Sequence, residues 1–230
     1  MVMTDSLEAI EIETAPSPTA CVIWMHGLGA DGNDFVPIIP ELELPKTLAI
    51  RFLFPHAPMQ PVTCNRGVVM RAWYDLSGEL GSRRENEAGV RTSQARIEAL
   101  IAREKSRGIA ASRIVLAGFS QGGAIALQTG LRHPERLAGI IALSCVLPLA
   151  DSVASEASPA SRDVPIFMAH GTQDEVVPPA RARESRDKLL ELGYRVTWRE
   201  YPMPHSVCME EIADIAEWLR SILEPARTGA

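Results

Sequence analysis

Residues 112–133 read SRIVLAGFSQGGAIALQTGLRH. Residues 112–119 are an apolar run typical of a buried strand, and residues 121–133 have the composition of a helix that the next residue, a proline, ends. The turn between them, GFSQG (118–122), matches the pattern Gly-x-Ser-x-Gly. A strand that leads directly into this pattern and a helix that leads directly out of it indicate one unit of a parallel, helix-covered sheet.

The glycines of this turn have a physical reason. To direct its Oγ towards the open end of a sheet, Ser120 must lie on a tight, strained turn. The positions two before and two after it then crowd each other, so only Gly118 and Gly122 fit, and Gly123 lets the helix pack close to the strand. An incidental serine in a glycine-rich turn would give the same letters, so the motif alone leaves both interpretations open.

Apolar runs alternate with helix-like runs along the rest of the chain. We expect strands at residues 19–27, 47–55, 68–75, 112–119, 136–144, 164–171 and 194–202, and helices at 32–44, 89–107, 121–133, 178–193 and 206–223. This alternation predicts an α/β fold with a mostly parallel central sheet and helices on both faces. Ligands bind beyond the carboxyl ends of such strands, so the residues just after each strand are candidates for chemistry.

The domain organisation is expected to be simple. Residues 1–18 read as a polar lead-in, residues 19–224 as a single domain and residues 225–230 as a tail. Residues 146–162 are small and polar, which indicates a loop. The chain between Ser120 and the candidate acid Asp174 already contains a helix, a strand and this loop, so no large cap domain fits there.

Composition excludes several classes of function. The net charge of −6 argues against nucleic acid and anionic membranes as partners, because both require clustered positive charge. No apolar stretch is long enough to predict a membrane-spanning segment, and no signal peptide is evident at the N-terminus. The cysteines have neither zinc-ligand spacing nor a disulfide pattern, so we expect a cytoplasmic protein with reduced thiols at Cys21, Cys64, Cys145 and Cys208.

A serine nucleophile needs a base, and the base needs an acid to orient it. In hydrolases with this motif the order along the chain is nucleophile, acid, histidine. Of the five histidines, only His205 follows both Ser120 and a well-placed acid. That acid is Asp174, shortly after the expected strand 164–171, with Glu175 as its rival.

The negative oxygen of a tetrahedral intermediate needs hydrogen-bond donors. The backbone N–H of Gln121, at the start of the helix, is one candidate, and the helix dipole supports it. The second should come from the loop after an early strand, which is HGLG (26–29), and we expect it to be the N–H of Leu28. A plain glycine turn would also explain these residues.

Six motifs together resemble the bacterial carboxylesterase and acyl-protein thioesterase (lysophospholipase-like) family. They are HGLGADGNDF (26–35), FPHAP (54–58), RAWYD (71–75), GFSQGG (118–123), HGTQDEVVP (170–178) and YPMPHSVC (201–208). The similarity extends from about residue 19 to 222. It implies an α/β-hydrolase fold, the triad Ser120, Asp174 and His205, and an oxyanion hole formed by the amides of Leu28 and Gln121. It further implies hydrolysis of a small ester or acyl substrate without a metal or cofactor, and it leaves a homodimer open because the family contains dimers.

The substrate is less constrained by the sequence. The apolar residues Trp73, Leu76 and Met70, with Tyr74, could line an acyl groove, and packing in the core explains them equally well. An esterase for short- to medium-chain acyl groups and a thioesterase or lysophospholipase would use the same machinery. A non-catalytic binding protein would normally lack a triad member, and a dienelactone-hydrolase-like enzyme would carry cysteine in place of Ser120.

Overall fold

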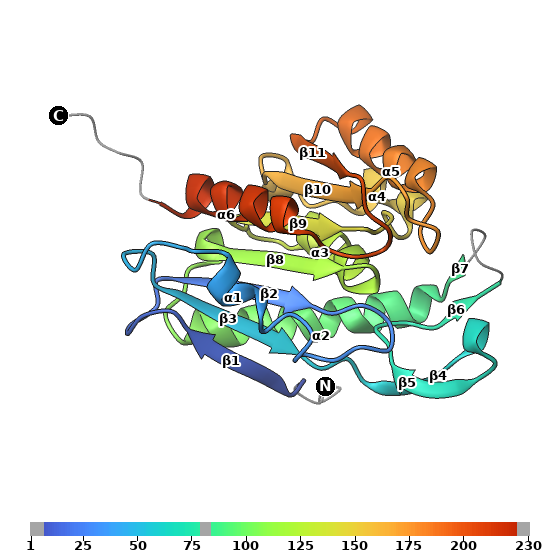
Figure 1. Ribbon diagram of the computed structural model, residues 1–230, viewed down its shortest axis with the longest axis horizontal. Helices are drawn as coiled ribbons and strands as arrows, with labels where there is room; N and C mark the ends of the chain where they lie inside the picture. The colour runs from blue at the N-terminus through green and yellow to red at the C-terminus, as the bar shows by residue number, and fades with distance from the viewer. Residues whose placement is uncertain (1–6, 79–83, 225–230) are drawn as a thin grey trace.

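The computed structural model describes residues 7–78 and 84–224. Its centre is a seven-stranded sheet in which every neighbouring pair is parallel except the first, where β1 runs antiparallel to β3 (Figure 1). In spatial order the strands are β1 (Ala9–Glu13), β3 (Ile50–Pro55), β2 (Ala20–Met25), β8 (Ile114–Phe119), β9 (Gly139–Leu143), β10 (Ile166–Gly171) and β11 (Val196–Tyr201). The predicted α/β fold with a mostly parallel sheet is confirmed.

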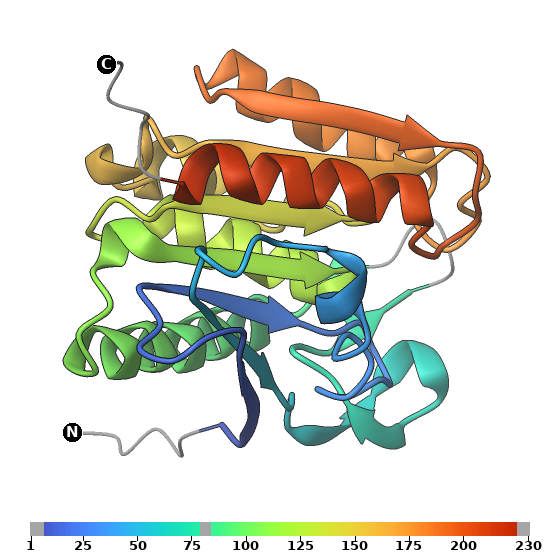
Figure 2. The ribbon, with the colours of Figure 1, turned by 60° about the vertical axis from the view of Figure 1, so that its left-hand side comes forward.

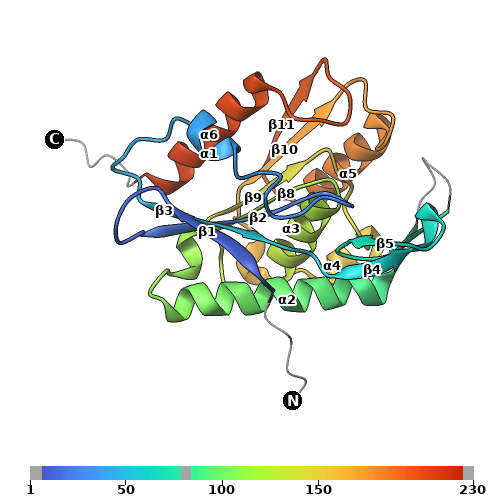
Figure 3. The same cartoon turned by 60° about the horizontal axis from the view of Figure 1, so that its bottom comes forward.

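Helices cover both faces of this sheet, as expected. The helices α2 (Glu87–Ser106), α3 (Gln121–Arg132) and α5 (Pro179–Glu191) lie on one face, and α1 (Ile38–Glu41) and α6 (Met209–Leu223) lie on the other (Figure 3). Each face of the sheet has its own hydrophobic core, and the side chains of a strand alternate between the two. Leu116 of β8 packs in the core under α2, α3 and α5, while Val115 and Ala117 pack in the core under α1 and α6. The central strands are buried on both faces, which explains their continuous apolar runs.

The order of the strands determines where a ligand can bind. From β2 the chain first adds β3 on one side and later β8 on the other, so the order reverses between β2 and β8. The parallel strands all end at the same edge of the sheet (Figure 2). The loops after β2 and β8 therefore meet at a topological switch point, where sheets of this kind bind their ligands.

Two expectations need correction. The supposed lead-in contains β1, whose residues Ile10 and Ile12 pack against the core beside β3. Its alternation is too short and its burial too partial to give a clear signal. The expected helix at 32–44 contracts to the single turn α1, because Pro37 and Pro40 cannot supply the N–H groups that a longer helix needs.

The remaining elements are short and lie outside the sheet. Residues 55–89 contain two small ribbons, β4 (Met59–Val62) with β5 (Val68–Arg71) and β6 (Leu76–Ser77) with β7 (Arg84–Glu85). The expected loop 146–162 contains α4 (Val153–Glu156) and the 3₁₀ turns Ala150–Ser152 and Pro159–Ser161; the others are Thr63–Asn65 and Ala111–Arg113. Within the described residues, no helix is long and apolar enough to cross a membrane.

Candidate active site

Ser120 lies on a strained turn between β8 and α3. Its backbone has φ 55° and ψ −120°, a positive-φ conformation that residues other than glycine rarely adopt. A Cβ added at Gly118 would collide with the backbone of Gly122, and one added at Gly122 would collide with the Met25 carbonyl. The Ser120 N–H donates to Leu143 O at 2.8 Å, which attaches the turn to β9. Gly118 is therefore required by the crowding within the turn that the sequence predicted, whereas Gly122 is required by its contact with the end of β2, which the sequence did not predict.

His205 and Asp174 meet after the last two strands. The loop after β11 carries His205, whose Nδ1 lies 2.7 Å from Asp174 Oδ2, and the loop after β10 carries Asp174. The other carboxylate oxygen, Oδ1, accepts the backbone N–H groups of Val176 at 2.9 Å and Val177 at 2.8 Å. One oxygen of Asp174 is thus fixed by its own loop, and the other is available to orient the imidazole.

The rival acid, Glu175, makes no hydrogen bond or ion pair with His205 within the described residues. Glu175 is exposed, whereas Asp174 is only 3 % exposed. Burial alone would raise the pKa of Asp174, but the hydrogen bonds from His205 and the Val177 amide, with the nearby His170, hold it below its ordinary value. Asp174 is therefore a carboxylate at neutral pH, and its second oxygen fixes the orientation of the His205 ring.

Two histidines outside this pair order the loop that follows β2. His26 Nδ1 lies 2.7 Å from Gly27 O, and its Nε2 accepts the Ala57 N–H at 3.0 Å. Burial lowers the pKa of His26 to about 4, so the ring is neutral and able to accept this bond. His56 Nδ1 accepts the Gly32 N–H at 3.0 Å, further along the same loop. The loop with the candidate donor Leu28 is thus attached to the chain on both sides of that residue.

The two candidate amide donors border the same pocket as Ser120. Leu28 and Gln121 both line it, and neither N–H has a hydrogen-bond acceptor among residues 7–78 and 84–224. Gln121 is the first residue of α3, where an N–H has no helical carbonyl to reach. Its side chain is fixed as well, because Oε1 accepts the Trp73 N–H at 3.0 Å and Nε2 donates to Tyr74 O at 2.9 Å.

The pocket has a volume of about 270 Å³, and both Ser120 and His205 line it. The Phe119 ring lies against His205, with 4.6 Å between the ring centroids. Sequence reasoning did not single out several of the lining residues, because nothing in a sequence shows which way they face. These are Ala30, Asp34, Glu85, Phe119, Ala124, Cys145, Val146, Val176, Val177 and Arg181.

Only part of the expected acyl groove borders this pocket. Leu76 and Tyr74 line it, whereas Trp73 and Met70 do not. Trp73 is buried in the core instead. Its indole N–H donates to His26 O at 2.8 Å, and its ring packs against the His26 ring. Met70 lies in β5 and faces a separate, shallow hollow beside Gly29.

The strand order, the strained serine turn and the acid–histidine pair define the class of an α/β-hydrolase. Residues 7–223 match the model of the phospholipase/carboxylesterase family, so the chain belongs to this family. Acyl-protein thioesterase 1 of Neurospora crassa is 44% identical over 211 residues, covering 87% of this chain and 86% of the relative. Acyl-protein thioesterase 1 of Yarrowia lipolytica is 39% identical, covering 92% and 95%.

Solved structures agree with the fold. Arabidopsis thaliana SOBER1 superimposes with a TM-score of 0.83 at 32% identity, over 89% of this chain and 99% of that one. The esterase PE8 superimposes with a TM-score of 0.81 at 27% identity, over 95% of this chain and all of that one. The protein is thus a serine hydrolase of the esterase and thioesterase type. The sequence resemblance was to bacterial enzymes, whereas these thioesterase relatives are fungal.

Proposed function

We propose that the protein is a carboxylesterase that cleaves esters of short- to medium-chain acyl groups through an acyl-enzyme. Ser120 is the nucleophile, His205 the general base and Asp174 the group that orients it. The observation that carries this proposal is the 2.7 Å contact between His205 Nδ1 and Asp174 Oδ2 in a pocket that Ser120 also lines. With Nδ1 engaged, Nε2 is the nitrogen that remains for the serine proton.

The reaction then follows from the roles of these groups. Ser120 Oγ attacks the ester carbonyl carbon while His205 Nε2 takes its proton. The oxygen that becomes negative is stabilised by the N–H groups of Leu28 and Gln121. His205 returns the proton to the leaving alcohol as the carbon–oxygen bond breaks, which leaves the acyl group on Ser120. Water, deprotonated by His205, then releases the acid and restores the serine.

Replacing the nucleophile is the direct test. Ser120→Ala should lower kcat on p-nitrophenyl butyrate by about 10⁶-fold, because the covalent step is lost. A fluorophosphonate probe followed by peptide mass spectrometry should label Ser120 in the native protein and no residue in the variant. Ser144→Ala serves as control, since Ser144 is buried after β9 and does not line the pocket. Absence of labelling at Ser120 would favour a binding protein on a hydrolase scaffold.

The relatives named acyl-protein thioesterase support a second candidate function, in which the same residues cleave a thioester. Comparing kcat/KM on an S-acylated cysteine peptide with kcat/KM on the p-nitrophenyl ester of the same acyl group separates the two. A value at least tenfold higher on the peptide would assign a thioesterase. A cytoplasmic location, a homodimer and action without a metal or cofactor remain predictions.

A further inference from the structure

The pocket has two sides with respect to Ser120. His205 protonates the leaving group in the proposed reaction, so the leaving group must face His205. A second hollow, lined by Gln173, Glu175, Val176 and Pro204, also borders His205, and we take it as the exit for the leaving group. The acyl group then takes the rest of the pocket, and we call the acyl arm the part lined by Tyr74, Leu76, Glu85, Cys145, Val146 and Arg181.

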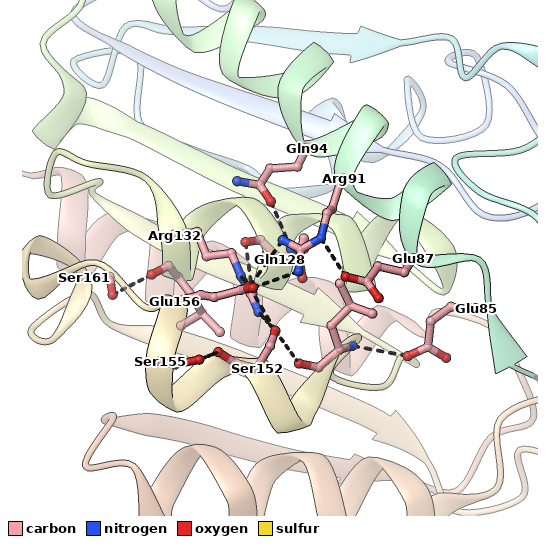
Figure 4. Close-up of polar contacts among 12 residues, drawn as sticks. Glu85, Glu87, Arg91, Gln94, Gln128, Arg132, Ser152, Ser155, Glu156 and Ser161 are labelled. Carbon is pink, nitrogen blue, oxygen red and sulfur yellow. Dashed lines mark hydrogen bonds and ion pairs between the residues drawn. The ribbon is translucent and has the colours of Figure 1, made fainter.

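Most of the acyl arm is apolar, but it contains one carboxylate and one guanidinium. The Glu85 carboxylate is held in place: its Oε1 accepts the Leu149 N–H at 3.2 Å (Figure 4). The segment that carries Leu149 is itself anchored, because Glu156 accepts bonds at 2.7 Å from both Arg91 of α2 and Arg132 of α3. Glu85 thus presents a fixed negative charge to the arm.

The backbone of Arg181 is anchored, through Ser185, to the segment that follows β9. It lies in the first turn of α5, where Ser185 Oγ donates to Arg181 O at 2.9 Å and accepts the Leu147 N–H at 2.9 Å. In the part of the chain that the structure describes, the guanidinium makes no hydrogen bond and no ion pair, with Glu85 or with any other residue. Both side chains are half-buried, so their charges are partly removed from water.

The charges of Glu85 and Arg181 both affect the Tyr74 phenol. Burial raises the pKa of its phenol, the Glu85 carboxylate raises that pKa further, and Arg181 opposes the change. The phenol therefore lies within electrostatic range of both groups. An alkyl chain that extends this far would cover the Arg181 guanidinium and the second oxygen of Glu85 without giving either a partner, which is unfavourable.

We propose that Glu85 and Arg181 form a recognition site for an uncharged polar group at the far end of the acyl chain. The inference rests on the proposed function and adds its substrate class: short acyl esters that end in a carboxamide or hydroxyl. Such a group accepts a hydrogen bond from Arg181 and donates one to Glu85, so both charges gain a partner. A carboxylate in the same place would be attracted by Arg181 but repelled by Glu85.

Three sets of p-nitrophenyl esters test this inference, with three to six methylenes and a terminal carboxamide, carboxylate or isopropyl group. The carboxamide and isopropyl ends have nearly the same shape. The kcat/KM for the carboxamide divided by that for the isopropyl ester therefore measures polar recognition alone. For the best chain length we expect a ratio of about ten in the native protein. Arg181→Leu should lower this ratio to about one or below. Glu85→Gln, which can still accept the Leu149 N–H, should raise carboxylate turnover relative to carboxamide about tenfold.

Arg183→Leu is the matched control. Arg183 lies on the same helix, pairs with Glu200 at 2.7 Å and does not line the pocket. The carboxamide-to-isopropyl ratio of this variant should therefore equal that of the native protein. The inference is overturned if the carboxamide shows no advantage at any length, if Arg181→Leu leaves the ratio unchanged, or if the carboxylate is the best native substrate. Turnover of p-nitrophenyl acetate by Ser120→Ala separates the two proposals. If Ser120→Ala still turns over this ester, the proposed function is overturned. If it does not, and Arg181→Leu leaves the carboxamide-to-isopropyl ratio unchanged, only the recognition site is overturned.

Discussion

Glu104 and Asp174 are both buried carboxylates, yet their surroundings differ. Glu104 of α2 is fully buried and contacts Arg51 at 2.7 Å, Arg107 at 3.0 Å and Arg103 at 3.3 Å. Asp174 has no arginine partner among the described residues; it has two loop amides, the His205 imidazole at 2.7 Å and the His170 imidazole at 3.4 Å. Arginine remains charged throughout the ordinary pH range, whereas imidazole can gain and lose a proton near neutrality. The first arrangement can only hold elements together, while the second can also move a proton.

The largest effect predicted from this comparison is on turnover. Asp174→Asn keeps the shape of the side chain but removes the negative charge that would stabilise the His205 imidazolium formed during the reaction. We expect kcat to fall by about 10⁴-fold. Steady-state kinetics on p-nitrophenyl butyrate measure this effect, and Asp163→Asn, an exposed residue before β10, is the control. A loss of less than tenfold would contradict the role given to Asp174.

Glu104→Gln should act on stability instead. It leaves Arg51 and its neighbours without their buried anion, which typically costs about 3–5 kcal/mol of unfolding free energy. Urea unfolding measures this loss, and kcat at 20 °C should be unchanged because Glu104 is not a pocket residue. Glu200→Gln, which breaks an exposed pair with Arg183, should cost less than about 1 kcal/mol. Equal losses in the two variants would remove the distinction between buried and exposed pairs.

A third carboxylate sharpens the comparison. Glu211 of α6 is fully buried, and neither of its oxygens has a hydrogen-bond partner among the described residues. Burial raises the pKa of Glu211 to about 8; the nearby Cys208 N–H opposes this rise, and the charge of Asp214 adds to it. Between the unfolded pKa of about 4.3 and the folded value, the native state therefore keeps a proton that the unfolded chain has lost.

The contribution of Glu211 to the unfolding free energy should consequently fall as pH rises from 5 to 8, because at this group the native state binds more protons over that range. Glu211→Gln carries no titrating proton, so this contribution should be absent from the variant. Urea unfolding at pH 5, 6, 7 and 8 measures the two curves. The difference, native minus variant, should decrease with pH; parallel curves would show that Glu211 does not titrate as its burial requires.

The candidate site could be located from sequence because its position depends on strand ends. Ser120, Asp174 and His205 each follow a strand of the parallel sheet, and the glycines at 118 and 122 reflect backbone contacts that any such turn must make. These are local rules that a pattern of apolar runs and glycines expresses directly.

The lining of the pocket could not be found in the same way. Trp73 and Leu76 are close in the chain and both apolar, yet one packs against His26 while the other faces the pocket. Arg181 reads in the sequence as one of several arginines on a solvated helix, and only its position at the start of α5 places it beside the pocket. Side-chain direction in irregular segments depends on tertiary contacts, which periodicity does not reveal.

The short strand β1 has a practical consequence for anyone who shortens this chain. It pairs with β3 from Ala9–Pro55 to Glu13–Arg51, and Glu11 binds Arg103 of α2 and Arg107, the residue that follows this helix, at 2.8 Å each. A version that started at residue 19 would leave β3 as an outer strand, still paired with β2 but with the N–H and C=O groups that now bond β1 left unpaired. Such an edge is a template on which further strands can add, so truncation there invites aggregation.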